Sequence, residues 1–332
     1  MSAIAFRFNI SKKEGFGHFS RCTAIAQQLN NNYKFKIHFI VNKNIPQALL
    51  KNFKNISIIS LNNKKNLSEE KNIYNKILNK KIKILFFDIK KNYKTIFLKK
   101  IKKNGTKLIT IDDKFNKRNY CDICFYPPIP QFKKLKWKNK KTKKYVGWKY
   151  IPIKIDYTSK LKKYKKNNKI LIIGGGSNYN NFISKILKRL NMFQEKLDII
   201  IPEGYGYNNN FSTIKNISSS KHNISLLSKK LPMVKIMLKS QIIIMPYGMS
   251  CFESMLLKKN SIILTRNKDD YQSASIFKKK EVCIVLKKIS NLNERLFRKF
   301  MSSKKNINNV SKISSYLRRG SFNIAKIINE TK

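Results

Sequence analysis

Two short apolar runs that each end in a glycine-rich turn constrain the fold of this chain most strongly. The first run, Ala3–Phe8, precedes Gly15-Phe16-Gly17 and a helix expected over Phe19–Leu29. The second run, Lys169–Ile173, leads directly into Gly174-Gly175-Gly176. A strand, a glycine turn and a helix in this order open a Rossmann-like domain. Because the pattern occurs twice in 332 residues, the sequence predicts two such domains.

Further apolar runs, separated by Lys-rich helical patterns, predict the remaining strands of both domains. They are Lys36–Val41, Ile56–Leu61, Ile82–Asp88, Lys107–Asp112, Asp198–Ile201, a run around Ile214–Ile217, Gln241–Met245, Ser261–Thr265 and Val282–Leu286, followed by helices at the C-terminal end. Strands that alternate with helices are typical of a parallel sheet with helices on both faces. We therefore expect an α/β fold with two Rossmann-like domains facing across a cleft, 1–153 and 154–332. The charged stretch 160–168 lies just after this boundary.

The charge of the chain bears on its partners. Lys and Arg number 72 against 17 Asp and Glu, a formal net charge of +55. Such a balance is typical of proteins that bind nucleic acid or anionic membranes. Here Lys, Asn and Ile, all with AT-rich codons, are spread through nearly every segment, so genome composition is a sufficient cause. We expect salt-sensitive, non-specific attraction to polyanions and no specific nucleic-acid partner.

Cysteine usage and apolar run lengths indicate a cytoplasmic protein. The chain has five Cys, an odd number, and its start is interrupted by Arg7, which is unlike a signal peptide. No apolar run approaches the ~18–20 residues of a membrane helix. Cys121-x-x-Cys124 has neither a second pair nor a nearby His, so buried small residues on a strand edge are favoured over a zinc or redox site. We expect no metal and no cofactor.

The first glycine turn carries the strongest signal for chemistry. Gly15 and Gly17 let the backbone approach a ligand closely, and the following helix start offers free N–H groups to an anion. His18 lies at that helix start, and Arg21 can share its face. The alternative interpretation is a glycine turn with a capping His.

Three further segments are candidates for ligand binding. Gly174–Gly176 with Ser177 and Asn178 forms a second turn, which can equally be plain loop geometry. Gly248 precedes Ser250 and Glu253, so the helix start there could hold a diphosphate, with Glu253 accepting hydrogen bonds from ribose. The same Ser-x-x-Glu spacing is also a capping box, with Ser250 as the cap. Asp112 and Asp113 follow a predicted strand and could face the cleft or form a turn.

Taken in order, these segments resemble the UDP-sugar hydrolases of pseudaminic acid biosynthesis, which act on UDP-2,4-diacetamido-2,4,6-trideoxy-β-L-altropyranose. Relatives of that family include the lipid II N-acetylglucosaminyltransferase and other GT-B proteins. The resembling segments are Gly15-x-Gly17-His18-x-x-Arg21, Ile111-Asp112-Asp113 with Cys121-Asp122-Ile123, Tyr145–Tyr150, Gly175-Gly176-Ser177, Leu231-Pro232-Met233, Gly248-x-Ser250-x-x-Glu253, and Gln272. The chain departs from the family pattern at Asn178, Tyr247 and Tyr271, in the substrate half of the cleft.

The resemblance implies a GT-B fold and a metal-independent hydrolysis that releases UDP and a free deoxy amino sugar. It makes His18 the general base, or the residue that positions the attacking water. It implies that the substrate is bound by Gly15, Gly17, Arg21, Asp112, Asp113, Gly175, Gly176, Ser177, Asn178, Gly248, Ser250, Glu253 and Gln272. Three alternatives stay open: a GT-B glycosyltransferase that uses a UDP-sugar donor, a non-enzymatic nucleic-acid binder, and a family member that binds a sugar nucleotide without turnover.

Overall fold

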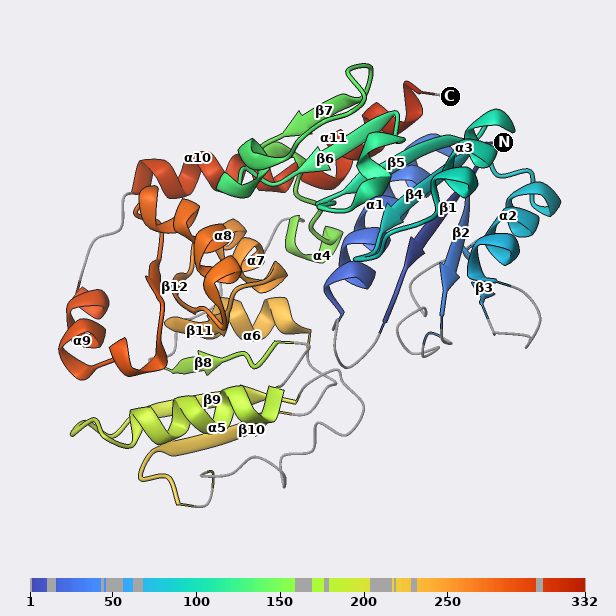
Figure 1. Cartoon of the computed structure of the whole chain (residues 1–332). Helices are drawn as coiled ribbons and strands as arrows, with labels where there is room; N and C mark the ends of the chain where they lie inside the picture. The colour runs from blue at the N-terminus through green and yellow to red at the C-terminus, as the bar shows by residue number, and fades with distance from the viewer. Residues whose placement is uncertain are drawn as a thin grey trace.

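The computed structural model describes residues 2–10, 16–42, 45, 56–61, 68–158, 169–175, 179–203, 217, 219–227, 232–302 and 307–331. These residues form two parallel sheets, of seven and six strands, each flanked by helices (Figure 1). The two predicted α/β domains are therefore confirmed.

The N-terminal sheet has the strand order β3-β2-β1-β4-β5-β6-β7. Its strands are β1 (Ala3–Phe8), β2 (Lys36–Val41), β3 (Ile56–Ser60), β4 (Ile84–Asp88), β5 (Lys107–Ile111), β6 (Ile123–Tyr126) and β7 (Lys143–Val146). All six residues of β1 are buried, as expected for a central parallel strand covered on both faces. The strands β2 and β3 are added on one side of β1, and β4 to β7 are added on the other side, so the strand order reverses between β1 and β4. Parallel sheets of this kind bind ligands at the carboxyl ends of the two strands that flank the reversal.

The C-terminal sheet repeats this topology in the order β10-β9-β8-β11-β12-β13. Its strands are β8 (Ile170–Ile172), β9 (Asp198–Pro202), β10 (Asn223–Leu227), β11 (Ile242–Pro246), β12 (Asn260–Leu264) and β13 (Ile284–Leu286). The corresponding switch point lies between β8 and β11. There Gly175, with φ of 77°, lies so close to Pro246 that an added Cβ would be 2.9 Å from its ring.

Helices cover both faces of each sheet. They are α1 (Gly17–Tyr33), α2 (Glu69–Asn79), α3 (Thr95–Lys103), α4 (Ile155–Thr158), α5 (Tyr179–Leu190), α6 (Met233–Lys239), α7 (Met249–Leu256), α8 (Lys268–Lys279), α9 (Glu294–Ser302), α10 (Ile307–Arg318) and α11 (Gly320–Asn329), with short 3-10 turns that include η2 (Asn116–Asn119), η3 (Pro130–Lys134) and η4 (Trp148–Tyr150). In the N-terminal domain, α1 packs on one face and α2 and α3 on the other. The C-terminal sheet lies between α6, α7, α8 and α10 on one side and α5 and α9 on the other.

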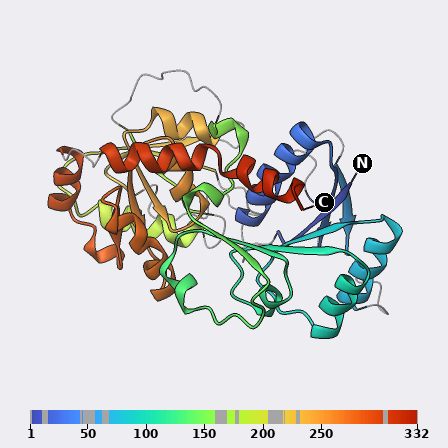
Figure 2. The same ribbon diagram turned by 90° about the horizontal axis from the view of Figure 1, so that it is seen from above.

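The last helix returns to the first domain. Figure 2 shows α10 and α11 running from the C-terminal domain across to the N-terminal domain. There α11 packs on α1, and its Ile324 and Ile328 join the core of that domain. Ser321 Oγ donates a hydrogen bond of 2.7 Å to the carbonyl of Ile153, in the connection between the domains. The predicted boundary at residue 153 places α11 in the second domain, but in the structure α11 packs against the first domain.

The structure differs from the sequence expectations at β6, β7, α1 and the edge strand β10. β6 and β7 were not expected as strands, and α1 is longer than expected at both ends. For the run expected around Ile214–Ile217, residues 214–216 lie outside the described residues and Ile217 lies in a bend. The edge strand that is described, β10, comes later, at Asn223–Leu227.

No helix among the described residues is long and apolar enough to cross a membrane. All five cysteines are free and buried; Cys124 lies on β6, and Cys121 lies just before that strand.

Candidate functional site

The carboxyl ends of the two sheets face each other across a cavity of about 190 Å³. The N-terminal domain lines it with Gly17, His18, Arg21, Lys90, Ile111, Asp112, Pro127 and Tyr150, the connection with Ile151 and Pro152, and the C-terminal domain with Tyr247, Gly248, Met249, Phe252, Arg266 and Asp270. Gly17, His18 and Arg21 follow β1, and Tyr247 and Gly248 follow β11. The cavity thus lies where both switch points meet.

Two helix starts open onto this cavity. α1 begins at Gly17 and α7 at Met249, and a Cβ added to Gly17 would be 3.7 Å from the Met249 side chain. Neither N-cap residue, Phe16 or Gly248, provides a side-chain cap. Backbone N–H groups at an uncapped helix start favour an anion. The cavity is therefore suited to a negatively charged ligand.

His18 lies between the cavity and a buried carboxylate. Its Nδ1 is 2.6 Å from Oδ1 of Asp88, the last residue of β4. Burial alone would raise the pKa of Asp88, but the charges and hydrogen bonds of Arg21 and His18 outweigh burial and lower this pKa to about 2. Because Asp88 is ionised, the proton shared over 2.6 Å belongs to Nδ1. In the neutral ring, Nε2 is then the hydrogen-bond acceptor and potential base.

Arg21 contacts the same carboxylate from the next turn of α1. Its Nε donates to Oδ2 of Asp88 over 3.0 Å, and its Nη2 donates to Oδ1 over 2.6 Å. Its Nη1 is 3.5 Å from Oδ2 of Asp112. The guanidinium therefore bridges two carboxylates at the edge of the cavity.

Asp112 remains accessible from the cavity. Its side chain is 28% exposed, and its backbone adopts φ of 51°, a left-handed conformation held by a hydrogen bond from its N–H to the Phe125 carbonyl. Burial raises the pKa of Asp112, the charge of Arg21 opposes this, and the charge of Asp88 adds to it. Asp112 thus stands where it can accept a hydrogen bond from a ligand.

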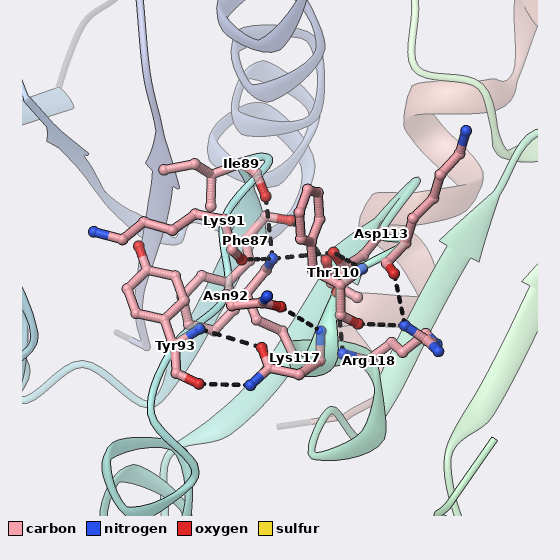
Figure 3. A network of polar contacts seen from close by, with 12 residues as sticks. Phe87, Ile89, Lys91, Asn92, Tyr93, Thr110, Asp113, Lys117 and Arg118 are labelled. Atoms are coloured by element: carbon pink, nitrogen blue, oxygen red, sulfur yellow. Dashed lines mark hydrogen bonds and ion pairs between the residues drawn. The ribbon is translucent and has the colours of Figure 1, made fainter. Parts of the chain in front are cut away.

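Asp113 is buried in a network of polar contacts (Figure 3). Its carboxylate accepts hydrogen bonds from the backbone N–H groups of Phe115 and Arg118 and pairs at 3.0 Å with Lys117 Nζ. The Lys117 side chain is fully buried and also donates to the carbonyls of Ile89 and Lys91. Asp113 does not line the cavity. Its carboxylate bonds within the loop that follows β5, and Lys117 joins that loop to the one that follows β4.

The C-terminal wall combines a charged pair with an aromatic ring. Arg266 Nε donates to Asp270 over 2.9 Å, and its Nη2 donates to the carbonyl of Tyr247 over 3.3 Å. The Tyr247 ring packs edge-on to Phe252 and Phe277. Tyr247 thereby occupies part of the cavity wall.

The remaining predicted site residues are distributed as follows. Glu253 is buried, and burial raises its pKa to about 7 against the opposing influence of Lys154 and a hydrogen bond from Tyr157. Ser250 does not cap α7, because the helix starts one residue before it and Gly248 is the N-cap. Gln272 lies on α8, outside the cavity lining. Gly15, Gly176, Ser177 and Asn178 lie outside the described residues.

The sequence interpretation missed Asp88, Lys90, Arg266 and Asp270. Asp88 was assigned only as the end of an apolar strand. A carboxylate at the end of the strand beside β1 was an available signal, because a 3-2-1-4 strand order places that position next to the helix that carries His18. Among the described residues, no group of three or more His, Cys, Asp or Glu side chains could hold a metal ion.

Comparisons with known proteins support the fold. No protein-family model and no curated protein sequence matches the chain. Its structure is similar to that of MurG from Acinetobacter baumannii, with 13% identity, a TM-score of 0.61 and coverage of 99% of this chain and 100% of the other. It is also similar to the glycosyltransferase SnogD from Streptomyces nogalater (7% identity, TM-score 0.64, 100% of both chains). A third similar structure is UDP-GlcNAc 2-epimerase from Neisseria meningitidis bound to UDP-GlcNAc (14% identity, TM-score 0.61, 99% of both chains). The chain has the GT-B fold.

Proposed function

We propose that this chain is an enzyme that transfers the sugar of a UDP-sugar to a hydroxyl group, with His18 as the general base. One observation carries the proposal. An imidazole oriented by a buried carboxylate lines a cavity onto which the starts of α1 and α7 open. The base and the anion-binding groups therefore occupy the same site.

The reaction follows from these positions. Nε2 of His18 accepts the proton of the attacking hydroxyl, whose oxygen forms a bond to C1 of the sugar. The bond between C1 and the diphosphate oxygen breaks, and its electron pair leaves with the diphosphate. N–H groups at the starts of α1 and α7, together with Lys90 and Arg266, face the cavity and would stabilise this developing charge. Direct displacement inverts the configuration at C1.

The C-terminal domain is proposed to hold the nucleotide, with Glu253 accepting hydrogen bonds from the ribose. Similar structures support a uridine nucleotide, since they include one bound to UDP-GlcNAc and one bound to UDP. The structural likeness to SnogD and to the glycosyltransferase of kitacinnamycin supports transfer to an acceptor.

Hydrolysis is a second candidate and uses the same site with water as the nucleophile. The segment Gly15-x-Gly17-His18-x-x-Arg21 favours it, through its resemblance to the hydrolases that release a deoxy amino sugar from UDP.

One experiment separates the two. Purified protein is incubated with a panel of UDP-sugars, including UDP-amino-sugars, and UDP release is measured with and without hydroxylated acceptors. Transfer requires an acceptor for release, whereas hydrolysis does not. In either case His18→Ala should lower kcat by about 10²–10⁴ with little change in UDP affinity. If neither UDP nor any UDP-sugar binds, or if His18→Ala retains full turnover, the proposal is wrong.

A further inference from the structure

Arg21 lines the cavity, yet its guanidinium is already engaged within the protein. Two of its nitrogens, Nε and Nη2, bond to the two oxygens of Asp88, and Nη1 lies 3.5 Å from Asp112. Its side chain is 14% exposed and that of Asp88 is 1% exposed. Arginine binds a carboxylate through a planar fork, which fixes the orientation of the carboxylate as well as its charge.

This orientation determines how His18 is protonated. Nη2 of Arg21 is 3.0 Å from Nδ1 of His18, and both groups approach Oδ1 of Asp88 at 2.6 Å. Because Nη2 is a donor only and directs a hydrogen at Oδ1, the shared oxygen accepts from both neighbours. A rotated Asp88 would lose Oδ1 as the acceptor for Nδ1–H, and the ring could then carry its proton on Nε2.

We propose that Arg21 is a positioning residue: it holds Asp88 so that His18 keeps its proton on Nδ1 and presents Nε2 as the base. The inference rests on the proposed function and replaces the substrate-binding role that the sequence implied for Arg21. It assigns the guanidinium to the protein side of the site, where its partners are two carboxylates, rather than to the nucleotide.

The direct test is the tautomer of His18, measured by NMR on protein labelled with ¹⁵N-histidine. Only three histidines, His18, His38 and His222, give signals, and His18→Gln assigns the relevant one. The wild type should show one neutral form with its proton on Nδ1, whereas Arg21→Gln should show a mixture. Arg21→Lys keeps the charge without the fork and should also show a mixture. Arg266→Gln, which removes a cavity arginine that does not contact Asp88, should leave the tautomer unchanged.

Kinetics supply the second measurement, on variants shown to be folded by circular dichroism. Positioning predicts that Arg21→Gln lowers kcat by about 10-fold or more with KM for the UDP-sugar nearly constant. A raised KM with unchanged kcat and a wild-type tautomer would make Arg21 a substrate ligand and overturn the inference. So would an Arg21→Lys enzyme that matches the wild type in tautomer and kcat. Because the NMR measurement needs no substrate, failure of the proposed reaction would not be mistaken for failure of the inference.

Discussion

Replacing Asp88 by Asn tests the catalytic geometry most directly. The amide has nearly the shape of the carboxylate but no charge, so it removes the partner that stabilises a protonated His18 ring during the reaction. The contact is 2.6 Å long and the carboxylate is 1% exposed, so water screens it little. The variant therefore acts on the charge at Nδ1 and leaves the cavity lining intact.

The magnitude follows from Coulomb's law. Two unit charges about 4 Å apart interact by about 4 kcal/mol at an effective dielectric constant near 20. Arg21 already shares the Asp88 carboxylate, so we expect about 2–4 kcal/mol of lost transition-state stabilisation. Since about 1.4 kcal/mol corresponds to a factor of ten, kcat should fall by about 30–1,000-fold.

The assay is UDP release from the UDP-sugar that the wild type turns over, with UDP affinity measured by calorimetry. Affinity should change little, because the nucleotide is proposed to bind the other domain. Asp198→Asn is a matched control, since Asp198 is exposed at the amino end of β9, the end of the strand away from the cavity. A folded Asp88→Asn enzyme with kcat within about threefold of the wild type would refute the role of Asp88.

Three further predictions concern the nucleotide site, the domain connection and metal ions. Glu253→Gln should weaken UDP binding by about 1–3 kcal/mol in calorimetry. Burial raises the pKa of Glu253 from 4.5 to about 7, so ionisation of this carboxyl destabilises the folded protein as pH rises through that range. Glu253→Gln should therefore melt at a higher temperature than the wild type at pH 8, but not below pH 4.5. Gly320→Ala would place a Cβ 1.9 Å from the Ile151 carbonyl oxygen, so it should destabilise the protein by about 3 kcal/mol or more in thermal melts. Gly248→Ala is the control, because its Cβ would meet no atom within 4 Å, and it should leave the stability unchanged. Turnover should survive EDTA, and activity lost to EDTA and restored by Mg²⁺ would contradict the metal-independent mechanism.

The central strands were predictable from sequence because they are buried on both faces and are therefore continuous apolar runs. β1 and β2 were predicted with the bounds that the structure gives them. β6 was missed because its apolar run is only four residues long, and the edge strand β7 was missed because it begins with two exposed lysines. Edge strands bury less, so their sequences carry a weaker apolar signal.

The site was predictable only in part. The glycine turn identified His18 because the signal is local, a strand end followed by a helix start. Asp88 lies 70 residues away, and its contact with His18 depends on the strand order, which the sequence pattern does not specify. The sequence gives no way to distinguish Asp112 from its neighbour Asp113. In the structure the backbone at Asp112 is left-handed, and the Asp112 side chain lines the cavity whereas that of Asp113 does not.

The return of α11 to the first domain has a consequence for biosynthesis. Ile324, Ala325 and Ile328 complete the core against α1, whose Cys22 and Ile25 are fully buried in the finished protein. During translation these α1 side chains emerge some 300 residues before their partners. Until α11 has been synthesised, the first domain therefore exposes an apolar groove along α1. A shortened polypeptide that ends before residue 320 would keep this groove open permanently and present it to chaperones.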